Sequence, residues 1–174
     1  LCGCMMQESQ VVEKIKQSYR FVDIMFGTFN IFKLAELLYS RWTQEDQIID
    51  IWDSTKDVVE ELPTQRKFPF KSGVNIMYGC NNFCTYCIVP YVRGRERSRS
   101  IENIVDEVRQ AVAKGYKEFT LLGQNVNSYG KDFGVKDQFA KLLRRVNEIP
   151  GVERIRYMTS HPRDMHEDVI KAVA

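Results

Sequence analysis

Three cysteines in one short segment carry the clearest chemical signal in the chain. The segment reads Cys80-Asn81-Asn82-Phe83-Cys84-Thr85-Tyr86-Cys87, which is a C-x3-C-x2-C spacing. Three thiolates this close together can ligate three irons of a four-iron cubane cluster and leave the fourth iron open to a small molecule. Zinc is the alternative, with His161 or His166 as a fourth ligand, although neither lies at a finger-like spacing after Cys87. The spacing favours an iron–sulfur cluster.

The elements around these cysteines alternate between strands and helices. Apolar runs predict strands at 73–78, 118–122 and 152–158, and helical apolar spacing predicts helices at 101–112, at 139–146 and from Val169 onward. Ser100 is the expected N-cap of the first of these helices. Strands spaced by about forty residues with helices between them form parallel βα units, and three units are too few to close an eight-stranded barrel.

The first part of the chain predicts a smaller α/β piece. Helices are expected at 8–17 and from Ile31 to Leu38, the latter capped by Asn30, and strands are expected at 21–26 and 48–52. The charged, proline-containing stretch 53–71 has little periodicity and is the best candidate for an interdomain linker.

Polar turns follow each predicted strand of the second part. Cys80 follows the first strand, Gly123 to Asn125 follow the second, and Thr159 to His161 follow the third. The carboxyl ends of parallel strands meet at one rim, where barrel enzymes build their active sites. The residues of the second and third turns could equally be ordinary turn formers.

Four arginines, Arg93, Arg95, Arg97 and Arg99, lie within seven residues and are interrupted by a single acid, Glu96. Such a run can bind RNA phosphates or a cofactor carboxylate through charge-assisted hydrogen bonds. A solvated charged surface is the alternative.

The composition describes a folded chain without an overall charge signal. Of 174 residues, 44% are hydrophobic and 28% are charged, and 25 basic residues against 23 acidic ones give a net charge of +2. Disorder is excluded, and the whole chain gives no signal for nucleic acid or membrane. Neither a spanning helix nor a secretory signal peptide is recognisable, and the five unevenly placed cysteines suit metal binding in a reducing, cytosolic setting.

The cysteine motif resembles that of the radical S-adenosylmethionine (SAM) enzymes, in which an aromatic residue, here Tyr86, precedes the last cysteine. The segment 88–99 (IVPYVRGRERSR) is similar to the stretch after the cluster loop in methylthiotransferases, a subgroup of these enzymes. Within the subgroup, 121–130 (LLGQNVNSYG) and 158–162 (MTSHP) resemble the MiaB-type tRNA enzymes. The resemblance covers nearly the whole chain.

This resemblance implies a two-part α/β fold. Residues 1–66 would form the C-terminal part of a Rossmann-like methylthiotransferase N-terminal domain. Residues 67–174 would form the first three βα units of a truncated radical SAM (β/α) barrel. The chain begins abruptly at Leu1-Cys2-Gly3-Cys4, so it is expected to be an internal fragment that is inactive alone.

The resemblance also implies roles for individual residues. Cys80, Cys84 and Cys87 would hold the catalytic [4Fe-4S] cluster, whose open iron binds SAM. Tyr86, Gly123 and Gln124 are then cofactor-binding candidates. Cys4 resembles the last of three cysteines that hold a second, auxiliary [4Fe-4S] cluster, the other two of which would lie upstream. Cys2 matches no ligand position and is expected to be a small buried hydrophobic residue.

By the same resemblance, the parent enzyme adds a methylthio group to C2 of N6-dimethylallyladenosine at position 37 of tRNA. One electron cleaves SAM to methionine and a 5′-deoxyadenosyl radical, a second SAM supplies the methyl group, and the auxiliary cluster carries the sulfur. The implied partners are tRNA and an electron donor such as flavodoxin or ferredoxin, for a monomer in the cytoplasm.

Two alternatives remain at this point. The substrate of the methylthiotransferase could be threonylcarbamoyladenosine in tRNA or a ribosomal protein, although those relatives usually differ at 124–126 and 160–162. The cysteines could instead hold zinc in a non-catalytic nucleic-acid-binding module.

Overall fold

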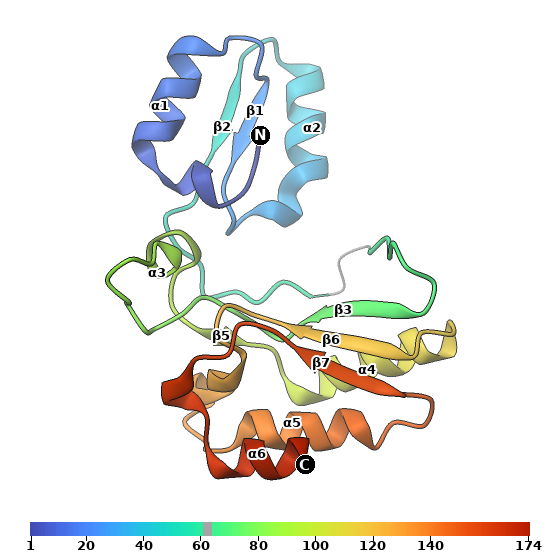
Figure 1. Ribbon diagram of the computed structural model, residues 1–174. Coiled ribbons are helices and arrows are strands. Elements are labelled where there is room, and N and C mark those ends of the chain that lie inside the picture. The colour runs from blue at the N-terminus through green and yellow to red at the C-terminus, as the bar shows by residue number, and fades with distance from the viewer. Residues whose placement is uncertain (61–63) are drawn as a thin grey trace. The chain divides into compact units, whose positions relative to one another are not determined.

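A computed structural model describes residues 1–60 and 64–174 of the chain (Figure 1). The chain forms two compact units, Leu1–Leu62 with Asn82–Gly94, and Pro63–Asn81 with Arg95–Ala174. The predicted linker at 53–71 contains no helix or strand before Lys71 in its described residues, and its positions 61–63 lie outside them. The assignment of residues 1–66 and 67–174 to two family domains stays a prediction.

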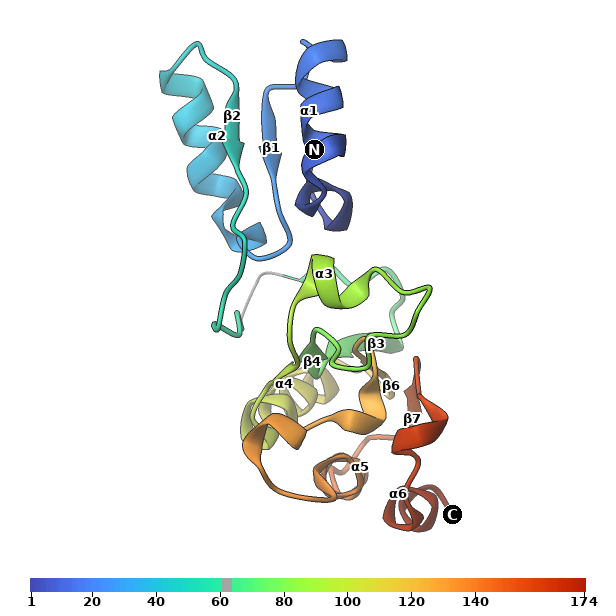
Figure 2. The same ribbon diagram turned by 90° about the vertical axis from the view of Figure 1, so that its left-hand side faces the viewer.

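The first unit is a small parallel sheet between two helices. Strands β1 (Ile24–Phe26) and β2 (Ile48–Asp50) pair in parallel, and helices α1 (Ser9–Ser18) and α2 (Leu34–Thr43) flank them on opposite sides (Figures 1 and 2). Alternate residues of a strand point to opposite faces, so Met25 packs with apolar residues of α1 while its two neighbours in β1 pack with Leu37 of α2.

Short helices complete the first unit. They are the 3-10 turns η1 (Cys4–Gln7) and η2 (Ile31–Lys33) and the helix α3 (Val89–Arg93), whose Val92 carbonyl accepts from Thr28 Oγ1 at 2.8 Å. Asn30 occupies the N-cap position of η2 as predicted, but its side chain makes no capping hydrogen bond. Its side chain accepts from Gly27 N and donates to the Asp50 carbonyl, and it bonds no helical amide.

The second unit is built on three parallel strands, each followed by a helix. Strands β3 (Lys71–Asn75), β6 (Glu118–Leu122) and β7 (Arg154–Tyr157) lie side by side in that order. Helices α4 (Ile101–Ala113), α5 (Gln138–Asn147) and α6 (Glu167–Val173) follow them in turn (Figure 1). The prediction of parallel βα units in this part of the chain is confirmed.

One face of this sheet packs against α4 and α5. Val74, Phe119 and Leu121 project from the strands into a core that also contains the apolar stripes of both helices. Ser100 caps α4 as predicted, because its hydroxyl accepts from Asn103 N at 3.2 Å.

The predicted strand at 73–78 is two strands in the structure. After β3 ends, β4 (Met77–Tyr78) pairs antiparallel with β5 (Arg97–Ser98). Ile76 separates β3 from β4. Its N donates to the Leu122 carbonyl, and its carbonyl accepts from Arg99 N. Three 3-10 turns lie in the later loops: η3 (Val126–Ser128), η4 (Lys131–Phe133) and η5 (Pro162–Asp164).

Candidate functional site

The turns that follow the parallel strands of the second unit are hydrogen-bonded to one another. Gly79 N donates to Gln124 Oε1 at 2.8 Å, which ties the segment after β4 to the turn after β6. Thr159 Oγ1 donates to the Gly123 carbonyl at 2.7 Å, which ties the turn after β7 to the same turn. The expected convergence at the carboxyl ends of the strands is therefore present between these three turns.

Gly123 allows the turn after β6 to lie directly on the core. A Cβ at this position would come within 2.6 Å of Met77 Cγ and 3.3 Å of Val126 Cγ1. Both neighbours are buried, so a larger residue would displace packed side chains. The structure thus gives Gly123 a packing role beside the predicted cofactor role.

The third turn behaves as the strand-ending turn that was one of its two interpretations. His161 N donates to Asn125 Oδ1 and Asn127 Oδ1 at 3.2 and 2.9 Å, and His161 Nδ1 accepts from Arg163 N at 3.2 Å. Asp164, only 2% exposed, accepts from Asn125 Nδ2 and pairs with Lys131. Nothing in the chain's spacing pointed to this buried acid.

The three clustered cysteines differ in exposure. Cys80 follows β4 in the second unit and is buried, whereas Cys84 and Cys87 are half-buried in the segment assigned to the first unit. Cys87 N donates to the Cys84 carbonyl at 2.9 Å, which closes a tight turn between these two ligand candidates. Tyr86, on that turn, is 92% exposed.

Cys4 lies beside a cation in the first unit. Arg93 Nε donates to Cys4 Sγ at 2.9 Å, from α3 to η1. The guanidinium can only donate, so this contact ties the Cys4 sulfur of η1 to α3 and fixes its position within the first unit. Cys2 is exposed, so the expectation of a buried residue there is wrong; its backbone forms an isolated bridge with Phe26 at the edge of the sheet.

The arginine run is not a uniform charged surface. Arg95 is exposed, Arg93 and Arg97 are half-buried, and Arg99 is 6% exposed. Arg99 Nη1 donates to the Asn75 carbonyl and to Glu107 Oε2, both at 2.7 Å. The Arg99 side chain is therefore engaged inside the unit and is not presented to a phosphate.

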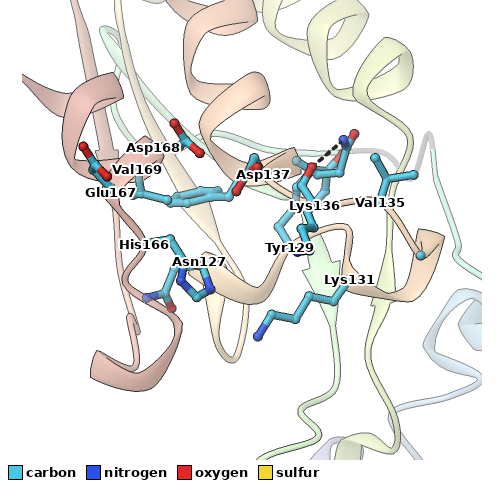
Figure 3. A pocket seen from close by; sticks show the side chains of 13 residues that line it. Asn127, Tyr129, Lys131, Val135, Lys136, Asp137, His166, Glu167, Asp168 and Val169 are labelled. Carbon is cyan, nitrogen blue, oxygen red and sulfur yellow. Dashed lines mark hydrogen bonds between the residues drawn. The ribbon is translucent and has the colours of Figure 1, made fainter.

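A cavity of about 620 Å³ opens at the amino ends of α5 and α6 (Figure 3). Lysines and carboxylates both border it, and Asn127 and His166 lie near each other on one side. Of the predicted site residues only His166, the alternative zinc ligand, lines it, and Asn127 links it to the turn after β7 through its bond to His161 N. The lining residues are Asn127, Tyr129, Lys131, Gly134, Val135, Lys136, Asp137, Gln138, Phe139, His166, Glu167, Asp168 and Val169.

Comparison with known proteins decides the family. Residues 74–174 match the family model described as the radical SAM superfamily. The chain belongs to the radical SAM superfamily. Membership implies a [4Fe-4S] cluster and SAM as cofactors and agrees with the mixed α/β fold.

Proteins of known name are similar to this radical SAM chain along nearly all of its length. It is 64% identical over 173 residues to tRNA-2-methylthio-N(6)-dimethylallyladenosine synthase of Lachnoclostridium phytofermentans, and 57% identical over 173 residues to the protein of that name in Acetivibrio thermocellus. Each match covers 99% of this chain. The chain spans 38% and 36% of the lengths of these two relatives.

Solved structures of the radical S-adenosylmethionine methyltransferase TsrM from Kitasatospora setae are also similar. The form with tryptophan substrate and a SAM analogue gives a TM-score of 0.47 at 17% identity, covering 60% of this chain and 20% of that one. The form with cobalamin and a [4Fe-4S] cluster gives 0.46 at 18% identity, covering 58% and 18%.

The chemistry of the donor set fits the cluster that radical SAM membership implies. None of Cys80, Cys84 and Cys87 is in a disulfide, and cysteine thiolates are the ligands of [4Fe-4S] clusters. Among the described residues, no three His, Cys, Asp or Glu side chains meet closely enough to form a metal site. The assignment of the three ligands therefore depends on their spacing and on the family.

Within the described parts of the chain, no helix is both long and apolar enough to cross a membrane.

Proposed function

We propose that this chain is part of an enzyme that adds a methylthio group to C2 of N6-dimethylallyladenosine at position 37 of tRNA. The observation that carries the proposal is the 64% identity, over nearly all of this chain, with a protein named for that reaction. The alternative of a zinc-binding module is less well supported, because the cysteine spacing occurs at the start of a radical SAM domain.

In this proposal Cys80, Cys84 and Cys87 hold the catalytic [4Fe-4S] cluster. When bound, the cluster supplies the electron that cleaves SAM to methionine and a 5′-deoxyadenosyl radical. Tyr86 and the turn at Gly123 and Gln124 border the cofactor. Gln124 keeps this turn attached to the segment before Cys80 through its bond to Gly79 N, so cofactor and cluster share one rigid edge.

Cys4 supplies one ligand of the auxiliary cluster, whose sulfur is transferred to the substrate. The contact from Arg93 supports this role, because a side chain that donates to the sulfur holds it in one position. In this proposal Arg93 contacts Cys4, and the arginines of the run that contact RNA are Arg95 and Arg97.

In this proposal residues 1–66 and 67–174 belong to the two family domains, and the segment Asn82–Gly94 of the second domain is part of the first compact unit. The first unit's parallel sheet with flanking helices fits the C-terminal part of a Rossmann-like methylthiotransferase domain, over residues 1–66. The three parallel strands of the second unit fit the first βα units of a radical SAM barrel, over residues 67–174. We propose a cytoplasmic monomer that takes electrons from a flavodoxin or ferredoxin.

Nucleoside analysis of tRNA tests the proposed substrate. In a strain that lacks the gene, the 2-methylthio form of dimethylallyladenosine should disappear while the unmodified dimethylallyl nucleoside accumulates. The intact gene should restore the modified nucleoside, and a gene carrying Cys84→Ser should not. A normal level of the 2-methylthio nucleoside in the deletion strain would reject the proposal. Loss of the 2-methylthio form of threonylcarbamoyladenosine instead, or of a modification on a ribosomal protein, would assign the other substrates.

A further inference from the structure

Both backbone amides that flank Cys80 are held by side chains from later in the second unit. Gly79 N donates to Gln124 Oε1 at 2.8 Å, and Asn81 N donates to Glu96 Oε1 at 3.3 Å. Cys80 itself is 8% exposed. The thiol therefore extends from a short segment that is fixed on both sides.

Glu96 makes the larger set of these contacts. Asn81 donates its Nδ2 to Glu96 Oε2, and the Asn81 Oδ1 accepts from Glu96 N, both at 3.3 Å. Ser128 Oγ donates to Glu96 Oε1 at 2.7 Å. The carboxylate thus accepts three hydrogen bonds, from the residue after Cys80 and from the 3-10 turn after β6.

The burial of Glu96 shows that these contacts are not incidental. Glu96 is 8% exposed and Ser128 is 2% exposed. This burial is unexpected, because Glu96 lies in a run of arginines whose charge predicts an exposed surface. A buried carboxylate costs free energy unless it accepts several hydrogen bonds, and charge-assisted bonds are the strong ones.

We propose that Glu96 is a positioning residue for Cys80. Its carboxylate fixes the backbone after Cys80 to the turn at 125–128, and so sets where the thiol meets the cluster. This inference rests on the proposed function, because it takes Cys80 to be a cluster ligand. Loss of a group that orients a ligand typically weakens metal binding about 10- to 100-fold, since a small displacement of a ligand weakens its bond.

The test measures how fast iron leaves the reconstituted chain. The variant Glu96→Gln keeps the size of the side chain but turns one acceptor end into a donor, so it cannot accept all three hydrogen bonds. We expect iron release to a chelator to be about tenfold faster than in the wild type. Addition of SAM should also change the electron paramagnetic resonance spectrum of the reduced cluster less in this variant than in the wild type. Glu102→Gln, an exposed acid at the start of α4, is the matched control and should release iron at the wild-type rate.

A second variant separates positioning from a general loss of stability. Asn81 is exposed, so Asn81→Ala leaves the core intact and should also release iron about tenfold faster. In that background, adding Glu96→Gln should change the rate less than it does alone, because both variants weaken the same connection, of which Asn81→Ala leaves only the bond from the backbone N of residue 81.

Wild-type release in both single variants, or full additivity in the double variant, would overturn the positioning role while leaving the proposed function intact. A wild-type chain that assembles no [4Fe-4S] cluster would reject the proposed function, and this inference with it.

Discussion

At the residue scale, Cys2 serves as a control thiol for the proposed cluster ligand Cys84. Cys84 is half-buried within the cluster motif, whereas Cys2 is exposed and matches no ligand position. We expect Cys84→Ser to lose most of the reconstituted iron, because a hydroxyl is a poor substitute for a thiolate ligand, and Cys2→Ser to keep it. Iron and sulfide content per chain, measured after anaerobic reconstitution, checks this. Full iron content in Cys84→Ser would remove the residue from the ligand set.

Arg99 is expected to matter for stability rather than for RNA binding. Its buried guanidinium pairs with Glu107 and with the Asn75 carbonyl, so Arg99→Met leaves that carbonyl without this donor and leaves Glu107 with Arg66 at 3.5 Å. We expect a loss of about 3 kcal/mol in the free energy of unfolding, measured in urea. Arg95→Met, at an exposed position, should change it by less than about 0.5 kcal/mol. Equal stabilities of the two variants would contradict the role assigned to Arg99.

The alternating run at 93–99 shows what a sequence can and cannot reveal about a site. The cysteine spacing predicts chemistry because metal ligation demands thiolates close together. The run of arginines looks uniform, yet β5 and the turn beside it bury Arg99 and Glu96 and expose Arg95. Which charges are buried depends on strand pairing between distant segments, so the positioning role of Glu96 was missed.

Gly123 tests the packing of the strand-end turns at the element scale. In Gly123→Ala the new Cβ would lie 2.6 Å from Met77 Cγ, an atom near the backbone of a buried side chain. We expect a destabilisation of about 1–3 kcal/mol in urea unfolding. Gly73→Ala is the comparison, because there the Cβ approaches only the end of the Leu122 side chain, at 2.9 Å. If Gly123→Ala lowers the free energy of unfolding no more than Gly73→Ala does, the turn after β6 can accommodate a Cβ at residue 123.

The pairing of β6 with β7 predicts a pH dependence. Burial raises the pKa of Glu118, but hydrogen bonds and charges from Arg156 and Arg154 outweigh it and hold this pKa below its ordinary value. A carboxyl pKa that is lower in the folded state stabilises the fold above the unfolded value of about 4.3, and this contribution is lost as the pH falls through the folded value.

The double variant with Arg154→Gln and Arg156→Gln should therefore unfold at lower urea concentration than the wild type at pH 7. The difference should shrink as the pH is lowered from 7 to 3, because progressive protonation of Glu118 removes the charge that the two arginines stabilise. Arg109→Gln, which removes an exposed pair with Asp106 in α4, should have little effect at either pH. A difference that is the same at pH 3 and pH 7 would show that the two arginines act through packing.

Long periodic elements were predictable and short ones were not. Helices α1, α4 and α5 follow from apolar spacing over several turns, and the parallel strands follow from their apolar runs. Helix α3 and the β4–β5 pair have five and two residues per element, too few to show a period. Asn30 has the residue type of a helix cap, but tertiary contacts to Gly27 and Asp50 use its side chain.

At the scale of the whole molecule, the order of the motifs along the chain explains the site. Each parallel strand of the second unit ends in a turn, and hydrogen bonds between the turns join segments more than thirty residues apart. The first cysteine, Cys80, lies in the earliest of these turns, so the architecture places this residue at the carboxyl edge of the sheet. The spacing of the strands predicted this edge, whereas the bonds that fix it required the structure.

The most direct test of the account is whether the chain holds a [4Fe-4S] cluster with an open iron. After anaerobic reconstitution with iron and sulfide, the reduced chain should show the electron paramagnetic resonance signal of a [4Fe-4S] cluster, and addition of SAM should change that signal. A colourless protein that retains stoichiometric zinc, or a cluster whose signal is unaffected by SAM, would contradict the account.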